Sequence, residues 1–368
     1  MSDIYLARDT RPQPESAPLY KDWFDTRTPV SDEDFRKQAQ VFPTLLQWAR
    51  RHFGEHITMQ TSPIGFGRLL LLNSLPDRMH YAQLPEAISS ALHGQCKVPH
   101  RIEKFDHTAS QHDYEYDARV AFLSHARHMP VYFPGDRDAW LHDTGNEYVG
   151  GREAWYKVSF EVPAKWDKIG LVPASYLDLG VQNTYLYPHV PGDKGKRWLH
   201  CSEVRLLREY EWHHIIHERA LFAPQSHKGA DPLRLWQERL ATALDGCETD
   251  LKRWKWLRVA LRRIALDTIG GFLKDGKAGG GMVMTNEGWG PAEAKHVYGT
   301  MLRYHMPQFN CAITARTRAA VTRMALKVPR GQLIKIVGDA IHTTERQDWI
   351  EDTGKVGSYR LKGITKNG

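Results

Sequence analysis

Residues 114–126 read YEYDARVAFLSHA, and this stretch decides the fold of the chain. Tyr114 and Tyr116 alternate with acidic residues, and an apolar run at 120–123 follows them. The pattern predicts a strand that ends in a turn at Asp117. A buried strand that delivers a carboxylate at its tip holds that group rigidly, which suits a metal ligand.

A second stretch of this kind, residues 332–345, reads QLIKIVGDAIHTTE. The apolar residues 333–337 lead into Gly338-Asp339, which predicts a hairpin with a tight turn. Two carboxylates from neighbouring strands can share a pair of Mg²⁺ ions, which stabilise the attacking and the leaving oxygen in phosphoryl transfer. The alternative is that Asp117 and Asp339 are turn formers, the commoner role of a single Asp at a turn.

A long amphipathic helix is predicted at 249–269. Its apolar stripe is opposed by a row of basic residues: Lys252, Lys255, Arg258, Arg262 and Arg263. Such a row could hold a triphosphate through charge-assisted hydrogen bonds. A basic helix face is, however, more often simply solvated.

The remaining elements are predicted from periodicity and capping signals. Helices are expected after Ser31, up to Gly54, from Pro232 to Gly246 and at 310–326, strands at 154–162, 203–210 and 213–222, and a linker at 275–281. This order of strands, helices and a final hairpin predicts an α+β architecture rather than alternating βαβ units. The sequence contains no P-loop and no strand-linked GxGxxG, which argues against the common nucleotide-binding folds.

The composition of the chain indicates which kind of partner it binds and whether it folds. The 368 residues include 50 Lys and Arg against 43 Asp and Glu, so the formal net charge is +7. This positive excess, with a pI near 9.1, favours an anionic partner such as nucleic acid. The hydrophobic fraction of 41% is ample for a packed core and excludes a disordered chain.

The sequence lacks several signals that would indicate a membrane protein, an exported protein or a zinc site. No apolar run approaches the roughly 20 residues that cross a bilayer, and no signal-peptide core precedes the first helix, so we expect a cytoplasmic protein without a membrane partner. His213 and His217 are read as surface histidines of a strand rather than a metal pair. Free thiols, not a zinc site, are expected of the four cysteines, which form no CxxC pair: Cys96, Cys201, Cys247 and Cys311.

The order of these segments resembles the polymerase core of family B DNA polymerases, in particular the protein-primed branch. YDARVAFLS resembles motif A, RIALDTIGG (263–271) resembles motif B, and VGDAIH (337–342) resembles motif C. FNCAITARTRAAVTRMAL is similar to the helix before motif C, and GKVGSYRLK (354–362) is similar to the element after it. The resemblance spans residues 90–362.

The resemblance implies template-directed nucleotidyl transfer by a two-metal mechanism. Asp117 and Asp339 are its implied catalytic residues and ligands of Mg²⁺ or Mn²⁺, and Phe122 is the implied steric gate against a 2′-hydroxyl. Arg263, or Arg262 in a register shifted by one, stands for the triphosphate-binding Lys. Further implied contacts to substrate are Arg258, Lys255 and Lys252, and implied contacts to primer or DNA are Thr314, Arg318, Lys355, Tyr359 and Lys362.

The implied fold is an α+β polymerase palm with an antiparallel sheet and a helical fingers element, lacking an exonuclease domain. We expect an N-terminal arm and helical region at 1–90, a first palm part with an insertion at 91–225, the fingers at 226–290, and a second palm part with the start of a thumb at 291–368. The implied partners are a DNA template-primer, deoxynucleoside triphosphates, and a protein primer or processivity partner, in replication of a mobile element. Proofreading is not expected, because the Asp-x-Glu exonuclease signature is missing.

Besides Phe122, which replaces the Tyr of motif A, three positions depart from the family pattern. Val337 stands where motif C has its first Asp, and Asp267 and Gly270 replace the Asn and the Tyr of motif B. These changes keep open the alternative of a catalytically degenerate polymerase fold that acts as a nucleic-acid-binding or interaction subunit. A third alternative is a basic α+β protein in which the motif matches are accidental.

Overall fold

The computed structural model describes two compact units, each assembled from two separate stretches of chain. The first unit contains residues 1–77 and 231–306, and the second contains 78–230 and 307–368. The linker expected at 275–281 lies outside the described residues, as does the N-terminal arm apart from 23–24. The described residues are 23–24, 31–74, 88, 101–105, 112–126, 140–175, 185–222, 232–272, 282–285, 288–291, 307–329 and 331–366.

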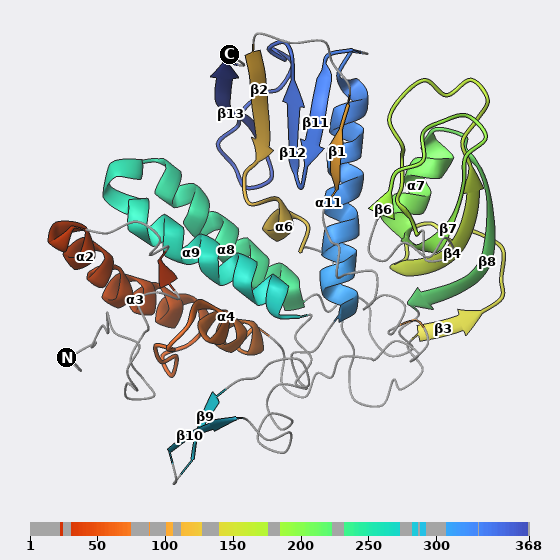
Figure 1. The fold of residues 1–368 in the computed structure, drawn as a ribbon. Coiled ribbons are helices and arrows are strands. Elements are labelled where there is room, and N and C mark those ends of the chain that lie inside the picture. The colour runs from red at the N-terminus through yellow and green to blue at the C-terminus, as the bar shows by residue number, and fades with distance from the viewer. Residues whose placement is uncertain are drawn as a thin grey trace. The chain divides into compact units, whose positions relative to one another are not determined.

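The first unit is mainly helical (Figure 1). Its elements are α2 (Asp32–Ala39), α3 (Val41–Phe53), α4 (Pro63–Leu72), α8 (Pro232–Glu248), α9 (Leu251–Gly271), and a hairpin of β9 (Met282–Thr285) and β10 (Gly288–Pro291). The Ser31 hydroxyl accepts from the Asp34 N–H at 3.1 Å and starts α2, and Gly54 ends α3. These caps and the two long helices α8 and α9 confirm the sequence prediction for this unit.

Helices α4 and α9 approach each other closely within this unit. A Cβ on Gly67 would lie 1.9 Å from the Thr268 hydroxyl and 3.1 Å from the Ile264 carbonyl oxygen, so only glycine fits this crossing. Arg68 donates to the Gly271 carbonyl at 3.2 Å near the end of α9. The apolar stripe of α9 is therefore used for packing, and its basic residues remain on the outside of the helix pair.

The second unit contains two larger antiparallel sheets. A five-stranded sheet has the order β1-β11-β12-β2-β13, a four-stranded sheet has the order β3-β8-β4-β7, and β5 pairs with β6. The strands are β1 (Ile102–Lys104), β2 (His112–Ala118), β3 (Trp140–Asp143), β4 (Ala154–Glu161), β5 (Ala174–Ser175), β6 (Tyr185–Leu186), β7 (Lys194–His200), β8 (His213–Phe222), β11 (Leu333–Val337), β12 (Ala340–Thr343) and β13 (Tyr359–Lys366). The helices of this unit are α6 (Ala121–Ser124), α7 (Cys201–Glu209) and α11 (Pro307–Lys327). This mixture of helices and antiparallel sheets confirms the α+β class.

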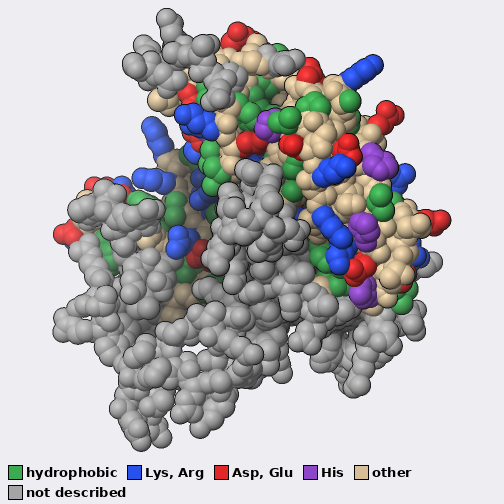
Figure 2. Space-filling model, turned by 45° about the vertical axis from the view of Figure 1, so that its right-hand side comes forward, with side chains coloured by type: hydrophobic (Ala, Val, Ile, Leu, Met, Phe, Trp, Pro, Cys, Tyr) green, Lys and Arg blue, Asp and Glu red, His purple; other side chains and the backbone are tan. Residues whose placement is uncertain are grey.

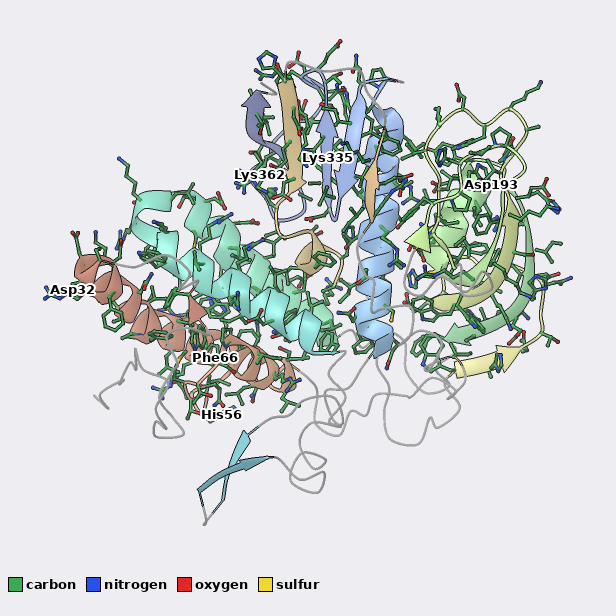
Figure 3. All side chains as sticks on the ribbon, viewed as in Figure 1. Asp32, His56, Phe66, Asp193, Lys335 and Lys362 are labelled. Carbon is green, nitrogen blue, oxygen red and sulfur yellow. The ribbon has the colours of Figure 1, made fainter. Side chains whose placement is uncertain are left out.

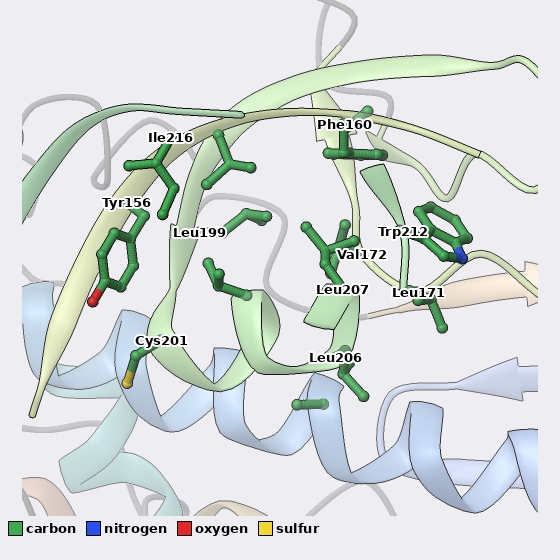
Figure 4. Packing of buried hydrophobic residues seen from close by; sticks show 14 of the residues in the cluster. Tyr156, Phe160, Leu171, Val172, Leu199, Cys201, Leu206, Leu207, Trp212 and Ile216 are labelled. Atoms are coloured by element: carbon green, nitrogen blue, oxygen red, sulfur yellow. The ribbon is translucent and has the colours of Figure 1, made fainter. Parts of the chain in front are cut away.

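Helix α11 takes part in both cores of the second unit. Its residues Val321 and Ala325 pack against Tyr116 and other buried side chains of the five-stranded sheet. Ala319 and Leu326 belong to the larger cluster beneath the four-stranded sheet. Figure 4 shows that this cluster fills the space between the curved strands and helix α7. The five-stranded sheet thus turns one face to α11 and presents the opposite face away from it.

One predicted strand is wrong. Residues 203–210 were expected to be extended, but Cys201–Glu209 form helix α7. His200 and Glu203 make a reciprocal capping box that starts the helix, and Val204 and Leu207 lie on its buried side. By contrast, β4 and β8 confirm the strands expected at 154–162 and 213–222, and α11 confirms the helix at 310–326.

Two further expectations concern thiols and membranes. Cys201 and Cys247 are free, as predicted, whereas Cys311 is disulfide-bonded, which corrects the prediction for that residue. The spacing rule failed there because a disulfide depends on the geometry of the two cysteines and does not require a CxxC motif. In the part of the chain that the structure describes, no helix combines the length and hydropathy needed to cross a bilayer.

Candidate active site

The register of the five-stranded sheet brings the two predicted aspartates to one edge. Asp117, near the end of β2, pairs directly with Ala340, the first residue of β12. Asp339 immediately precedes Ala340 in the two-residue turn between β11 and β12. Gly338 takes a φ of +67° in this turn, a conformation that glycine adopts without strain. Asp117 therefore lies on β2 and Asp339 in the turn that leads into the adjacent strand β12, and both are half-buried.

One row of paired residues crosses the sheet at this edge. Arg360 on β13 pairs with Asp117, and Val337 pairs with Ala340 on the other side. Directly opposed residues of antiparallel strands project to the same face, so this row includes Val337, the position that the resemblance aligns with the first acid of motif C. Val337 is 42% exposed there. The Arg360 Nε atom is buried without a hydrogen-bond partner among the described residues.

The pKa values of Tyr359 and Lys362 are both affected by the charges of Asp117 and Asp339, so the two carboxylates lie near the same side chains. Burial raises the pKa of Tyr359, and the charges of Asp339 and Asp117 raise it further. A hydrogen bond to Glu115 raises the pKa of Lys362, and Asp117 and Asp339 add to that effect. The same two groups thus respond to both aspartates. In Figure 3, Lys362 lies on β13 of this sheet, where its ammonium donates to Glu115 at 2.6 Å.

The chain after Asp117 makes a strained turn before α6. Val120 has φ +48° and ψ +51°, which is a rare conformation for a β-branched residue. Strain of this kind persists only where the surroundings hold it, and it concentrates at functional sites. The turn leads into Phe122, the predicted steric gate, which is half-buried in α6.

The loop at 352–358 is bound to this turn by an ion pair and by backbone hydrogen bonds. Arg119 makes a two-pronged ion pair with Asp352, at 3.0 and 2.8 Å, and this pair lowers the pKa of Asp352 to about 2. The Arg119 backbone also bonds to Ser358 at 2.9 Å and to Gly357 at 2.7 Å. The exposed Lys355 is carried by this loop. Sequence reasoning missed the Arg119–Asp352 pair, because 233 residues separate its members.

The two residues predicted on α11 are buried. Thr314 is 3% exposed and Arg318 is 9% exposed. The Arg318 guanidinium pairs with Glu203 of α7 at 2.8 Å. The Arg318 side chain thus ties α11 to α7, whereas the Thr314 hydroxyl donates to Asn310 within α11 at 3.4 Å, and the predicted contact of both residues with primer stays a prediction.

The basic residues of α9 differ in their surroundings. Arg258 pairs with Glu248, and Arg263 pairs with Asp267 one helical turn away at 2.9 Å. Asp267 and Arg263, which the resemblance to motif B aligns with an Asn and a Lys, are thus bound to each other. Arg262 is exposed, and Lys252 and Lys255 line a groove at the other end of the helix.

A second group of possible metal ligands lies elsewhere in the second unit. Among the described residues, Glu153, His200 and Cys201 offer three ligand atoms within 4.8 Å of one another. Glu153 already accepts from His200 at 2.6 Å and from Arg316 at 2.7 Å, and the Ser202 N–H donates to the other ring nitrogen of His200. Because these donors and acceptors are already engaged, the cluster acts as a buried hydrogen-bonded network.

The exposed histidines, by contrast, belong to a mixed charged surface. Glu218 bonds to Lys157 at 2.5 Å and to His142 at 3.2 Å, and Ser159 bonds to His217 at 2.8 Å. Figure 2 shows histidine, basic and acidic side chains interspersed on the described part of one face. This pattern agrees with the reading of His213 and His217 as surface residues, both of which are exposed.

Comparison with known proteins identifies the fold. No family model matches the sequence, and no curated protein matches it. A solved structure of phi29 DNA polymerase with primer-template DNA and incoming nucleotides is similar at a TM-score of 0.59 and 13% identity, covering 92% of this chain and 59% of that polymerase. The same polymerase with single-stranded DNA gives a TM-score of 0.56 at 13% identity, covering 92% of this chain and 58% of that one. The chain therefore has a fold similar to that of a DNA polymerase, over 59% of that polymerase's length.

Proposed function

We propose that this chain is a DNA polymerase that performs template-directed nucleotidyl transfer. The observation that carries the proposal is the register that sets Asp117 beside the Asp339 turn at one edge of a sheet in a polymerase-like fold. Two acidic motifs that are 222 residues apart have no structural need to meet, whereas a shared metal site requires it. The order of the motifs, which resembles the protein-primed branch, supports a protein primer and replication of a mobile element as the finer form of the proposal.

The donor set at this edge fits hard divalent cations. Asp117 and Asp339 supply carboxylate oxygens, the ligands that Mg²⁺ and Mn²⁺ prefer. When bound, such ions stabilise charge on the attacking and the leaving oxygen. Arg360, in register with Asp117, and Lys362, bonded to Glu115, offset part of the negative charge when the ions are absent.

The remaining roles are those that the motif resemblance implies, and the position of each side chain in its own unit supports them. Phe122 follows the strained turn after Asp117 and rejects a 2′-hydroxyl by steric contact. Lys355, Tyr359 and Lys362 belong to the segment that borders the aspartates, and they hold the primer end. In the first unit, Arg262 and Arg263 hold the triphosphate.

Primer extension tests the proposal. A hairpin template-primer would be incubated with Mg²⁺ or with Mn²⁺ and with wild-type protein, Asp339→Asn or the control Asp193→Asn. Asp193 also follows a glycine of positive φ in a turn, but it lies before β7 in the other sheet (Figure 3). We expect extension by the wild type and by Asp193→Asn, and none by Asp339→Asn. Equal extension by Asp339→Asn would contradict the proposal.

A second candidate is a polymerase fold that binds nucleic acid without catalysis. It is favoured by Val337, which is exposed where motif C has an acid, and by the pair that Asp267 makes with Arg263. Salt-sensitive DNA binding by the wild type, with no extension in either metal, is the result expected of this candidate.

A further inference from the structure

A groove in the first unit carries a concentration of basic and aromatic side chains. It has a volume of about 550 Å³ and lies between α2, α3 and the first turns of α9. Its lining includes Asp34, Lys37, Lys252, Arg253, Trp254, Lys255 and Trp256. Four cations line the groove with one acid; Lys37 is already paired with Glu33 at 2.6 Å, so the positive charge that suits an anionic occupant comes from the three cations of α9.

The three cations of α9 in this groove are available for a ligand. Lys252, Arg253 and Lys255 are exposed, and none of them forms an ion pair with another described residue. Arg258 and Arg263 of the same helix are both paired with acids. The groove therefore holds cations that the fold leaves uncompensated, a feature typical of phosphate-binding surfaces.

The two tryptophans add flat apolar surface between these charges. Trp254 and Trp256 are half-buried, and Trp256 packs edge-on against Phe24 with ring centroids 5.8 Å apart. Arg253 lies 4.5 Å from the Trp254 ring centroid, and Lys255 lies 4.5 Å from that of Trp256. Aromatic rings set among cations bind unpaired bases by stacking while the cations bind the backbone phosphates.

Helix geometry separates this groove from the other basic end of α9. Lys252 and Arg263 are 11 residues apart, which corresponds to about 16 Å along the helix axis. A triphosphate held by Arg262 and Arg263 would be centred at the other end of the helix. The cations at 252–255 are therefore available to bind a different anion.

We propose that the groove binds single-stranded nucleic acid. Lys252, Arg253 and Lys255 bind consecutive phosphates, and Trp254 offers a face on which a base stacks. This binding needs neither a divalent metal nor a nucleotide, so it stands independently of the proposed polymerase activity.

Fluorescence anisotropy on the whole chain tests the inference. The probe is a labelled oligothymidylate of about 16 nucleotides, with metal and nucleotides absent. We expect Lys252→Gln/Lys255→Gln to weaken binding at least about tenfold and to reduce the salt slope by about 1.4, because each phosphate contact on a single strand contributes about 0.7. The matched control is Arg36→Gln/Arg51→Gln, which removes two exposed cations of the same unit that do not line the groove. This control should change affinity less than about twofold, because its two positions make no proposed phosphate contact.

Three outcomes would overturn the inference. The first is unchanged affinity in the groove variant, and the second is equal loss in the control, which would indicate a net-charge effect. The third is a blunt duplex of equal length that binds the wild type as tightly as the single strand and loses affinity equally in the groove variant. Thermal unfolding of both variants confirms that each is folded. None of these outcomes depends on primer extension, so failure of the groove and failure of the polymerase proposal are distinguishable.

Discussion

Two Gly-Asp turns of the second unit share their local chemistry and differ in their surroundings. Gly338-Asp339 joins β11 to β12, and Gly192-Asp193 precedes β7, with glycine φ values of +67° and +87°. Asp193 belongs to a turn closed by backbone bonds to Val162 at 2.9 and 3.0 Å. Asp339 instead lies beside Ala340, which pairs with Asp117. The Gly-Asp dipeptide therefore accounts for both turns, whereas only the order of the strands around Asp339 brings a second aspartate close to it.

The largest expected effect is on catalysis. Asp117→Asn and Asp339→Asn should each lower primer extension by at least about 10³-fold, and the double variant should be no worse, because the two residues act as a unit. Asp193→Asn should retain full activity. Single-turnover extension rates measure these differences. Additive losses, or a comparable loss in Asp193→Asn, would break the comparison between the two turns.

A purely structural carboxylate gives the next largest effect. Glu203→Ala removes both the buried ion pair with Arg318 and the capping bond to the His200 N–H, so the free energy of unfolding should fall by about 3–5 kcal/mol. The control is Glu161→Ala, whose exposed pair with Lys194 should contribute less than about 1 kcal/mol. Urea unfolding measures both values. A loss below 1 kcal/mol in Glu203→Ala would contradict the structural role.

Acid unfolding probes another buried carboxylate, Glu153. Burial alone would raise its pKa, but His200 and Arg316 lower it from 4.5 to about 2. Because this pKa is lowered by folding, the stabilisation is present above pH 4.5 and is lost as the pH falls toward 2. Between about pH 5 and pH 3 the wild type should therefore lose stability as Glu153 takes up a proton, and Glu153→Gln should lack this contribution. Urea unfolding of both proteins at the two pH values measures this difference. An equal loss of unfolding free energy in the wild type and in Glu153→Gln would contradict the account.

An acid introduced at Val337 should raise activity rather than lower it. Val337→Asp places a carboxylate in the row that contains Ala340 and Asp117, so extension should rise by about tenfold, or about 1.4 kcal/mol. Val337 is 42% exposed, so stability should change by less than about 0.5 kcal/mol. Pro191→Asp, at the matching position before Gly192, serves as the control. No gain with either metal would favour the degenerate-fold candidate.

The smallest effect separates turn stability from site chemistry. Gly338→Ala and Gly192→Ala should each cost about 1 kcal/mol of unfolding free energy, because alanine is strained at positive φ and no atom crowds either position. Only Gly338→Ala should also slow extension. Thermal unfolding measures the loss of stability, and extension assays measure the rate. Equal slowing of extension in both variants would contradict the account.

Local elements could be predicted from the sequence, and long-range pairing could not. Alternation in 114–117 and capping at Ser31 lie within a few residues, so β2 and α2 were predicted correctly. The same alternation rule failed at 203–210, where the His200 capping box starts a helix. The pairing of Asp117 with Ala340 joins residues 223 positions apart, and no local pattern specifies it.

The candidate site was predicted through its motifs and not through its partners. Alternate positions in β2 put Glu115 on the same face as Asp117, but no local pattern identifies Lys362, 247 residues away, as its partner. The pairs Arg119–Asp352 and Arg318–Glu203 depend on tertiary contacts between distant segments, so sequence alone gave no indication of them.

Metal binding tests the central claim, that Asp117 and Asp339 form one site, without requiring catalysis. Electron paramagnetic resonance would count bound Mn²⁺ in the wild type, Asp339→Asn, Asp117→Asn and Asp193→Asn, each with template-primer and nucleotide and with protein-free solutions subtracted. The account predicts equal binding by the wild type and Asp193→Asn, and at least about tenfold weaker binding by the other two variants. Wild-type Mn²⁺ affinity in Asp339→Asn would contradict it.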